Sequence, residues 1–242
     1  MKKLKIVITA GGTSEYIDKV RKITNSGTGK LGANITNELL KREDIETIYY
    51  ICTPKAIKPI EDKRVKIIEI INTNNLKESV ETILKNQNID WFIHSMAVSD
   101  YYVDYVSTAS LLANELKQNS NFEQVLLNAI NKLDNSDKLS SNEDNLILVL
   151  KQTPKIINLI KKISPKTNLI GFKLLENVTE EYLLTIAKQL RDKNQCEYVV
   201  ANDLKNIKNG NHKAFLLDKQ DNVKIMNGKL DIAMNISHIV NN

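Results

Sequence analysis

Two glycine-rich turns near the start of the chain have the residue types that bind phosphate. The first, Ala10-Gly11-Gly12-Thr13, directly follows the β-branched run at 4–9. The second, Ser26-Gly27-Thr28-Gly29-Lys30, comes after a polar excursion and adds hydroxyl groups and a lysine. Backbone N–H groups between a strand and a helix N-terminus hold phosphate oxygens. The two turns together predict a site that binds a nucleoside triphosphate beside a second substrate.

Three further segments follow expected strands and carry polar side chains. Residues 94–101 combine small residues with Asp100, a carboxylate suited to Mg²⁺, which takes few protein ligands and shares phosphate oxygens. Residues 171–173 (Gly-Phe-Lys) offer an aromatic face and a cation, and residues 201–203 (Ala-Asn-Asp) offer an amide and a carboxylate. Lys138 lies in a polar segment, where a mobile cation could close over phosphates.

Each of these residues also has a structural explanation. Gly11 and Gly12 suit a tight turn, and Asn25 suits an N-cap or turn position. Asp100 and Asp203 suit helix caps. Taken singly, Lys138 is a solvated lysine and Phe172 a core residue, so the residues support only a nucleotide-binding α/β protein.

The elements that must position these residues alternate along the chain. Strands are expected at 4–9, 47–52, 65–71, 90–95, 145–150, 168–172, 196–202 and 213–218, and helices at 31–42, 74–85, 154–163, 179–193 and 230–240. Alternating strands and helices indicate a doubly wound, mainly parallel sheet with helices on both faces. We therefore predict a single α/β domain over 1–242, Rossmann-like, with its functional loops at the carboxyl ends of the strands.

One segment departs from this alternation. Residues 102–144 are rich in Asn, Ser, Asp and Lys, and contain one helix-like piece. A long stretch without regular structure is uncommon in a compact domain and often forms a lid or a binding loop. We interpret it as an inserted flap or dimerisation segment.

Composition excludes several classes of protein. No apolar run is long enough to cross a bilayer, and the N-terminus does not fit a signal peptide, so we expect a cytoplasmic protein without membrane contact. The two cysteines, Cys52 and Cys196, fit no metal-ligand spacing. The net charge of +5 is spread along the chain without a basic, aromatic-rich stripe, which argues against nucleic-acid binding.

The order and wording of the motifs resemble those of the phosphopantothenoylcysteine synthetase (phosphopantothenate–cysteine ligase) family. ITAGGTSEYIDKVRKITNSGTGKLG is similar to that family's opening signature, and HSMAVSDY to its A-A-V-[AS]-D-[YF] segment. DKLSS with LILVLKQTPKII, GFKLL and VVANDL resemble three further family segments in the same order. The resemblance runs from residue 4 to about 218 and favours the stand-alone form, without a fused flavin decarboxylase.

This resemblance implies a ligase of coenzyme A biosynthesis. A nucleoside triphosphate, CTP or ATP, activates the carboxylate of 4′-phosphopantothenate as an acyl-nucleotide, releasing pyrophosphate, and the amine of cysteine then forms the amide. Mg²⁺, lysines and backbone N–H groups would offset the repulsion between the two anionic reactants. The family also implies a homodimer whose flap covers the neighbour's site, and a separate decarboxylase as the pathway partner.

The resemblance also implies a role for each matched residue. Asn25 would stabilise the acyl-nucleotide, and Lys138 would support attack on it. The other expected contacts are, for the nucleotide, Gly11, Gly12, Thr13, Asp100 (also the metal), Phe172, Lys173, Ala201, Asn202 and Asp203, and, for the substrate, Ser26, Gly27, Lys30 and Ala97.

Some features leave the details open. Asp18 and Arg21 match the family's D-x-V-R element, and a structural ion pair explains them as well as a ligand contact does. SGTGK replaces the commoner SSGK, and Lys173 leaves the choice between CTP and ATP open.

Two other functions compete with the ligase. The main rival is a Rossmann-type NAD(P) oxidoreductase, which needs GxGxxG at the first turn and an acidic residue after the second strand. This chain has AGGTSE and Cys52-Thr53 at those places. A non-catalytic nucleotide-binding module is the third possibility.

Overall fold

The computed structural model describes residues 2–143, 145–208 and 212–240. Within these ranges the centre of the fold is an eight-stranded sheet in the order β12-β11-β10-β9-β6-β1-β4-β5. Neighbouring strands from β10 to β5 are parallel, and β11 and β12 form an antiparallel edge. The strands are β1 (Leu4–Ala10), β4 (Ile45–Cys52), β5 (Val65–Glu69), β6 (Trp91–His94), β9 (Asn168–Leu175), β10 (Tyr198–Asp203), β11 (Lys213–Asp218) and β12 (Val223–Asn227). The predicted mainly parallel α/β sheet is confirmed.

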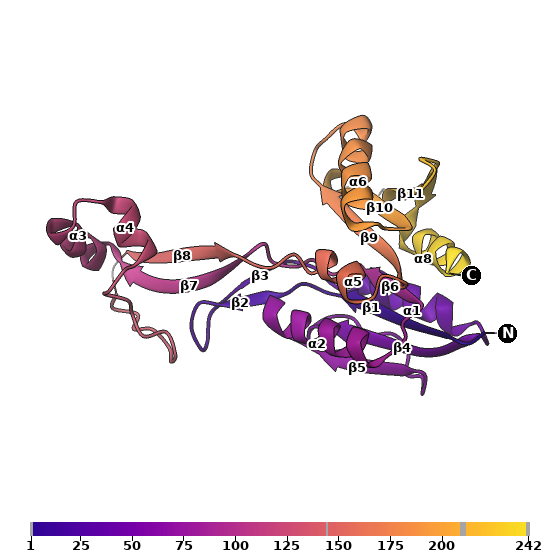
Figure 1. Ribbon diagram of the computed structural model, residues 1–242, viewed down its shortest axis with the longest axis horizontal. Helices are drawn as coiled ribbons and strands as arrows, with labels where there is room; N and C mark the ends of the chain where they lie inside the picture. Colours follow the sequence, from indigo (N-terminus) through magenta and orange to yellow (C-terminus); the bar gives the residue numbers. More distant parts are fainter. Residues whose placement is uncertain (1, 144, 209–211, 241–242) are drawn as a thin grey trace.

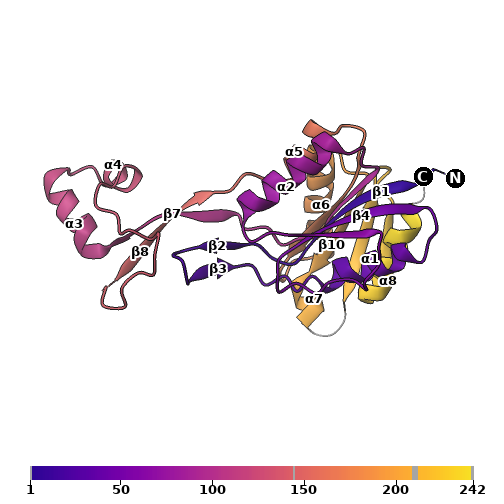
Figure 2. The same ribbon diagram turned by 90° about the horizontal axis from the view of Figure 1, so that it is seen from below.

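Helices cover both faces of this sheet (Figure 2). One face carries α1 (Lys30–Leu40) and α8 (Gly228–Ile239), and the other carries α2 (Thr73–Asn86), α5 (Ile157–Ile163) and α6 (Glu180–Asn194). Side chains alternate between the faces along a strand, so Ile6 and Ile8 enter one core while Val7 enters the other. Burying such a side chain stabilises the fold by about 1.5–3 kcal/mol, which is why β1 carries an unbroken apolar run.

An arm projects away from the sheet (Figure 1). It is an antiparallel ribbon of β7 (Tyr101–Thr108) and β8 (Leu146–Gln152), with α3 (Ala109–Gln118) and α4 (Phe122–Leu127) at its tip. Tyr105, Leu112, Val125 and Ala129 give the arm a small core of its own. The predicted strand at 145–150 therefore exists, but its place in the central sheet was wrong because it pairs with β7 instead.

The polar excursion between the two glycine turns is a second, shorter projection. Strands β2 (Ser14–Tyr16) and β3 (Lys22–Thr24) form a hairpin that runs outward beside the base of the arm (Figure 1). Strands β2 and β3 were not predicted, because three-residue strands leave no periodicity in the sequence. A short helix, α7 (Leu204–Lys208), follows β10.

Two findings concern the predicted class of protein. Within the described ranges, every helix is too short or too polar to span a bilayer. Cys52 and Cys196 are buried free thiols, and burial raises the pKa of the Cys52 thiol to about 11. Both cysteines therefore serve as small core residues.

Candidate functional site

The two glycine turns interlock through their backbones at the carboxyl edge of the sheet. A Cβ atom on Gly12 would lie 2.0 Å from the carbonyl oxygen of Asn25. A Cβ atom on Gly27 would lie 2.4 Å from the carbonyl oxygen of Gly11. Only glycine permits this approach. The first glycine turn, which was predicted to bind phosphate, is thus also the place where the two loops pack against each other.

The loop after β6, which contains Ala97, is hydrogen-bonded to these turns. The Thr13 N–H donates to the Ala97 carbonyl at 3.1 Å, and the Ala97 N–H donates to the Gly11 carbonyl at 2.9 Å. The Asn25 N–H donates to the Thr13 carbonyl at 3.1 Å. These bonds bring Asn25 and Ala97 together although they are 72 residues apart. Among the described residues, the Asn25 side chain makes one long hydrogen bond, from Nδ2 to the Ala97 oxygen at 3.5 Å, so its amide is available to a ligand.

A cleft of about 310 Å³ opens over the interlocked turns. Its wall includes Gly12, Asn25 and Gly27, which sequence analysis had selected. Lys22 and Lys55 also line it and were missed. Lys55 follows β4 within three residues, so its place at the carboxyl edge of a strand was the signal that could have found it. Two lysines beside an open amide make this cleft suitable for an anionic ligand.

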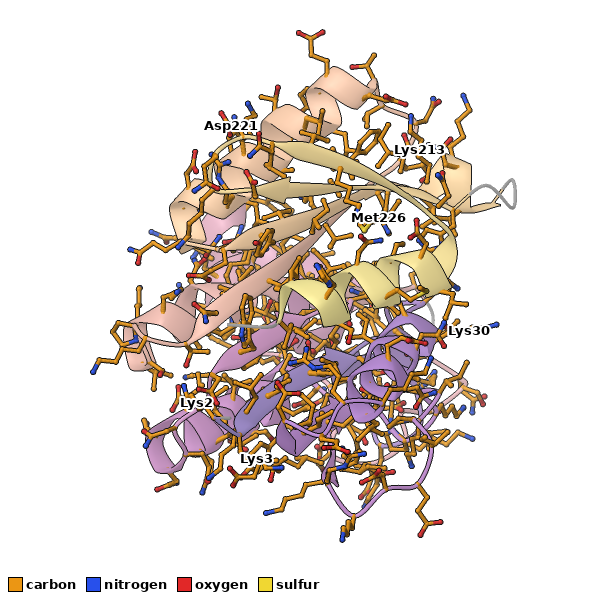
Figure 3. The ribbon with its side chains drawn as sticks, turned by 90° about the vertical axis from the view of Figure 1, so that its right-hand side faces the viewer. Lys2, Lys3, Lys30, Lys213, Asp221 and Met226 are labelled. Carbon is orange, nitrogen blue, oxygen red and sulfur yellow. The ribbon has the colours of Figure 1, made fainter. Side chains whose placement is uncertain are left out.

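Helix α1 begins directly after the second turn. Gly29, at φ 76°, occupies the N-cap position, and neither a side-chain cap nor an acidic residue is present in the first turn. Lys30 is exposed and extends outward from the molecule (Figure 3). Ser26 is exposed as well. The positive end of the helix dipole and Lys30 therefore act on the same edge of the sheet.

A second cavity, of about 140 Å³, lies beside the loop after β6. Its wall includes His94, Asp100, Lys155 and Phe172. Lys155 forms an ion pair with Asp100, and both side chains are largely exposed. Asp100 and Phe172 thus share one cavity, as expected of two residues predicted to contact the same nucleotide.

His94 stands in this wall as a neutral side chain. Burial lowers its pKa to about 4. Its Nδ1 lies 2.8 Å from the Thr9 hydroxyl oxygen, which also accepts the Met96 N–H at 3.3 Å. We assign the Thr9 hydroxyl proton to this contact with Nδ1, which leaves the histidine proton on Nε2.

Hydroxyl groups connect the two cavities. The Thr13 hydroxyl donates to Ser99 Oγ at 3.0 Å and accepts the Ser99 N–H at 2.8 Å. The Thr153 hydroxyl, at the base of the arm, donates to the Ser99 carbonyl at 2.5 Å. Thr13 is fully buried, so its side chain joins loops together and does not face the cleft.

The predicted segments on β9 and β10 lie within the strands rather than after them. Lys173 pairs with Ala201 in register, because β9 continues to Leu175. The Asp203 carboxylate accepts backbone N–H bonds from Asn177 at 3.0 Å, Val178 at 2.9 Å and Lys205 at 2.8 Å. These bonds lower the pKa of Asp203, so its carboxylate is charged and holds the loop between β9 and α6 in place.

Asn202 differs from its neighbour. Its Nδ2 lies 3.2 Å from His212 Nε2, while its buried Oδ1 has no hydrogen-bond partner in the described part of the chain. A buried polar atom without a partner is costly, and a hydrogen-bond donor on a ligand would satisfy it.

Lys138 is not brought into the cleft of Asn25. It is exposed on the loop that leads back into β8, and the next residue, Leu139, bonds to Asp18 and Arg21 at the hairpin tip. Asp18 and Arg21 form an ion pair, which is the structural alternative left open from the sequence.

The predicted magnesium site needs acidic side chains as ligands. The described residues contain no cluster of three or more His, Cys, Asp or Glu side chains that could hold a metal. Asp100, which is exposed and ion-paired with Lys155, fits an ion whose remaining ligands are phosphate oxygens and water. This donor set is compatible with magnesium that arrives together with a nucleotide.

Comparisons with known proteins identify the family of this chain. The chain matches the DNA/pantothenate metabolism flavoprotein C-terminal domain family over residues 1–129 and 128–242. A crystal structure of the DNA/pantothenate metabolism flavoprotein from Streptococcus pneumoniae is 38% identical, with a TM-score of 0.84 and 98% of both chains covered. The coenzyme A biosynthesis bifunctional protein CoaBC of Thermococcus kodakarensis is 31% identical over 83% of this chain.

The chain matches only part of the length of one relative, and it shares the fold of another at low identity. The chain spans only 41% of the length of that archaeal relative. A Cab2 variant in complex with phosphopantothenate-cysteine shares the fold at a TM-score of 0.69 and 16% identity, covering 98% of this chain and 85% of Cab2. The resemblance to phosphopantothenoylcysteine synthetases is confirmed, and the chain belongs to the DNA/pantothenate metabolism flavoprotein C-terminal domain family.

Proposed function

We propose that this protein is a phosphopantothenate–cysteine ligase of coenzyme A biosynthesis. It would join 4′-phosphopantothenate to cysteine and convert CTP, or ATP, to the monophosphate and pyrophosphate. Family membership supports the reaction class, and the arrangement of the two glycine turns supports the chemistry. We also propose that the ligase acts in the cytoplasm and that a decarboxylase consumes its product.

The chemistry proceeds in two displacements. A carboxylate oxygen of phosphopantothenate attacks the α-phosphorus of the nucleotide, and pyrophosphate leaves. The amine of cysteine then attacks the acyl carbon, the nucleoside monophosphate leaves, and the amine loses one proton. Magnesium, bound with the triphosphate, would neutralise charge on the phosphates.

The residues of the cleft fit these steps. The Asn25 amide can donate to one oxygen of the acyl-nucleotide and accept from another group. Lys22 and Lys55 would offset the charge of the two anions. Asp100, Phe172, Lys173, Ala201 and Asn202 would form the nucleotide side of the site, whereas Ser26, Gly27, Lys30 and Ala97 would contact the substrate. The single observation on which the proposal rests is the half-buried Asn25 side chain, which is held by the two interlocked turns and the Ala97 loop in a cleft that Lys22 and Lys55 also line.

The test is a substrate-dependence assay. The purified protein is incubated with phosphopantothenate, cysteine, Mg²⁺ and either CTP or ATP, and pyrophosphate and amide are measured. Pyrophosphate release that requires phosphopantothenate, with amide formation that also requires cysteine, is expected. Tight NADH binding without pyrophosphate release would instead identify a dehydrogenase.

We further propose that the protein acts as a homodimer in which Lys138 completes the site of the partner subunit. Lys138 does not line the cleft of Asn25 within one chain, because its loop is bonded to the hairpin tip at Asp18 and Arg21, whereas Asn25 lies beside Ala97. Mixing Asn25→Asp with Lys138→Gln subunits tests this. If the site is shared, the equimolar mixture recovers up to about a quarter of the wild-type activity, since about half of the dimers are mixed and each mixed dimer has one intact site of two. A site built within one chain gives no recovery.

A further inference from the structure

The loop that carries Lys138 is fastened to the tip of the β2–β3 hairpin. Asp18 is 2% exposed, and its carboxylate accepts the Leu139 N–H at 3.1 Å. Arg21 Nη2 donates to the Leu139 carbonyl at 3.1 Å. Both backbone groups of the residue after Lys138 are thus held by one ion pair.

Further bonds fasten the preceding residues of the loop. Asn135 Nδ2 donates to the Ile17 carbonyl at 2.9 Å. Lys19 forms an ion pair with Asp137 at 2.8 Å. Lys138 therefore lies between two residues that are tied to the same hairpin tip, while its own side chain is exposed.

Asp18 is the centre of this arrangement. Its carboxylate accepts five hydrogen bonds: the N–H groups of Val20 (2.8 Å), Arg21 (2.7 Å) and Leu139, and Arg21 Nε (2.8 Å) and Nη2 (2.5 Å). Four of them close the hairpin turn, and the fifth crosses 121 residues of sequence to the Lys138 loop. Charge-assisted bonds of this kind are the stronger class.

We propose that Asp18 is a positioning residue that fixes Lys138 for the second step of the reaction. This inference rests on the proposed function, in which Lys138 supports the attack of cysteine on the acyl-nucleotide. The same hairpin carries Asn25 directly after β3, so one rigid element sets the place of both residues. The hairpin then sets the distance between Asn25 and Lys138 in each chain.

The first experiment separates the two half-reactions in Asp18→Asn. Asparagine keeps the size of the side chain but removes the charge that holds Arg21 and Leu139. We expect the pyrophosphate burst to stay within about twofold of wild type, while amide formation falls at least about fivefold because a positioned group is displaced. Equal loss in both half-reactions, or no loss in either, overturns the inference.

A double-mutant cycle with Lys138→Gln tests whether Asp18 acts through Lys138. Residues that act through one group show non-additive effects. In the Lys138→Gln background, Asp18→Asn should change amide formation by less than about twofold. An undiminished loss in that background shows that Asp18 acts elsewhere and overturns the inference.

Two further variants distinguish a specific effect on Lys138 from misfolding and from a general loss of rigidity in the arm. Asn135→Asp removes one bond at the rim of the same contact and should show a smaller loss with the same non-additivity; additive behaviour, or no loss, overturns the inference. Glu115→Gln is the matched control, because its buried carboxylate accepts the N–H groups of Ile130 and Asn131 at the arm tip, away from Lys138. It should leave both half-reactions unchanged, and a selective loss of amide formation there overturns the assignment to Asp18.

Hydrogen exchange gives a readout that is independent of catalysis. The Leu139 amide should be protected in wild type and exchange at least about tenfold faster in Asp18→Asn, while the Asn131 amide is unaffected. If the wild-type protein releases no pyrophosphate, the proposed function fails, and this measurement still decides whether Asp18 holds the loop. If Lys138→Gln forms amide at the wild-type rate, this inference fails while the ligase activity stands.

Discussion

Substitution of Gly12 by alanine tests the interlocked turns directly. The new Cβ would lie 2.0 Å from the Asn25 carbonyl oxygen, 2.8 Å from its carbon and 2.9 Å from the Gly27 nitrogen. All three atoms belong to the backbone, so no side chain can rotate away. Ordinary contact starts near 3.4 Å, and the two loops must therefore separate by more than 1 Å.

Two contributions set the expected loss of stability. Overpacking of this kind costs about 1–3 kcal/mol. Separation also weakens the bond from the Asn25 N–H to the Thr13 carbonyl, which contributes about 0.5–1.5 kcal/mol. The free energy of unfolding should thus fall by about 1.5–4.5 kcal/mol, measured in urea by the fluorescence of Trp91, which is buried in β6.

The activity should fall further than stability alone explains. A displacement of about 1 Å at a catalytic group can cost about 100-fold in rate, and the Gly12 change displaces Asn25. Gly228→Ala is the control: that residue has φ 86° and no atom within 4 Å of the added Cβ. It should lose about 1–2 kcal/mol of stability from its backbone conformation alone and retain full activity when folded. A folded Gly12→Ala protein with wild-type activity would refute the assignment of the turns to the site.

Three further predictions follow from the site. Asn25→Asp places a carboxylate where the amide faces the acyl-nucleotide, so amide formation should fall at least about tenfold relative to pyrophosphate release; an unchanged product ratio would contradict this role. The pKa of His94 is lowered to about 4, below that of the unfolded chain, so acidification from pH 6.5 to 4 protonates the unfolded state first and should remove about 2–4 kcal/mol of stability. His94→Gln should flatten that part of the pH profile, as measured by urea unfolding at each pH. Magnesium should bind measurably by calorimetry only with nucleotide present, and tight binding to the protein alone would contradict a site with a single exposed carboxylate.

The central sheet followed from the sequence because its strands are continuous apolar runs. Residues 4–9, 47–52 and 213–218 were predicted within a few residues of β1, β4 and β11. The antiparallel edge strand β12 was missed because Val223–Asn227 is only five residues long and neither alternates strictly nor forms a continuous apolar run. The destination of the 145–150 strand was missed because pairing with β7 depends on contacts across the arm, which no local pattern encodes.

The site was predictable where backbone chemistry decides it. Gly12, Asn25 and Gly27 were selected from the two turns, and all three line the same cleft. Lys22 was overlooked because an isolated lysine has no distinguishing pattern before the hairpin is known. Lys138 was assigned by resemblance to the attack on the acyl-nucleotide, and that role stays a prediction. Only the fold shows that its loop is bonded to residues 17–21.

The hydrogen bonds of two polar residues separate structural from functional roles at this edge of the sheet. Asp203 and Asn25 both follow or end strands, and either could contact a ligand on sequence grounds. The Asp203 carboxylate already accepts three backbone N–H groups, so a ligand would have to replace bonds that hold a loop. Within the described ranges the Asn25 amide makes one hydrogen bond, at 3.5 Å, so a ligand gains its hydrogen bonds at little cost to the fold. Removing Asp203 should therefore reduce stability, whereas changing Asn25 should reduce activity in a protein that still folds.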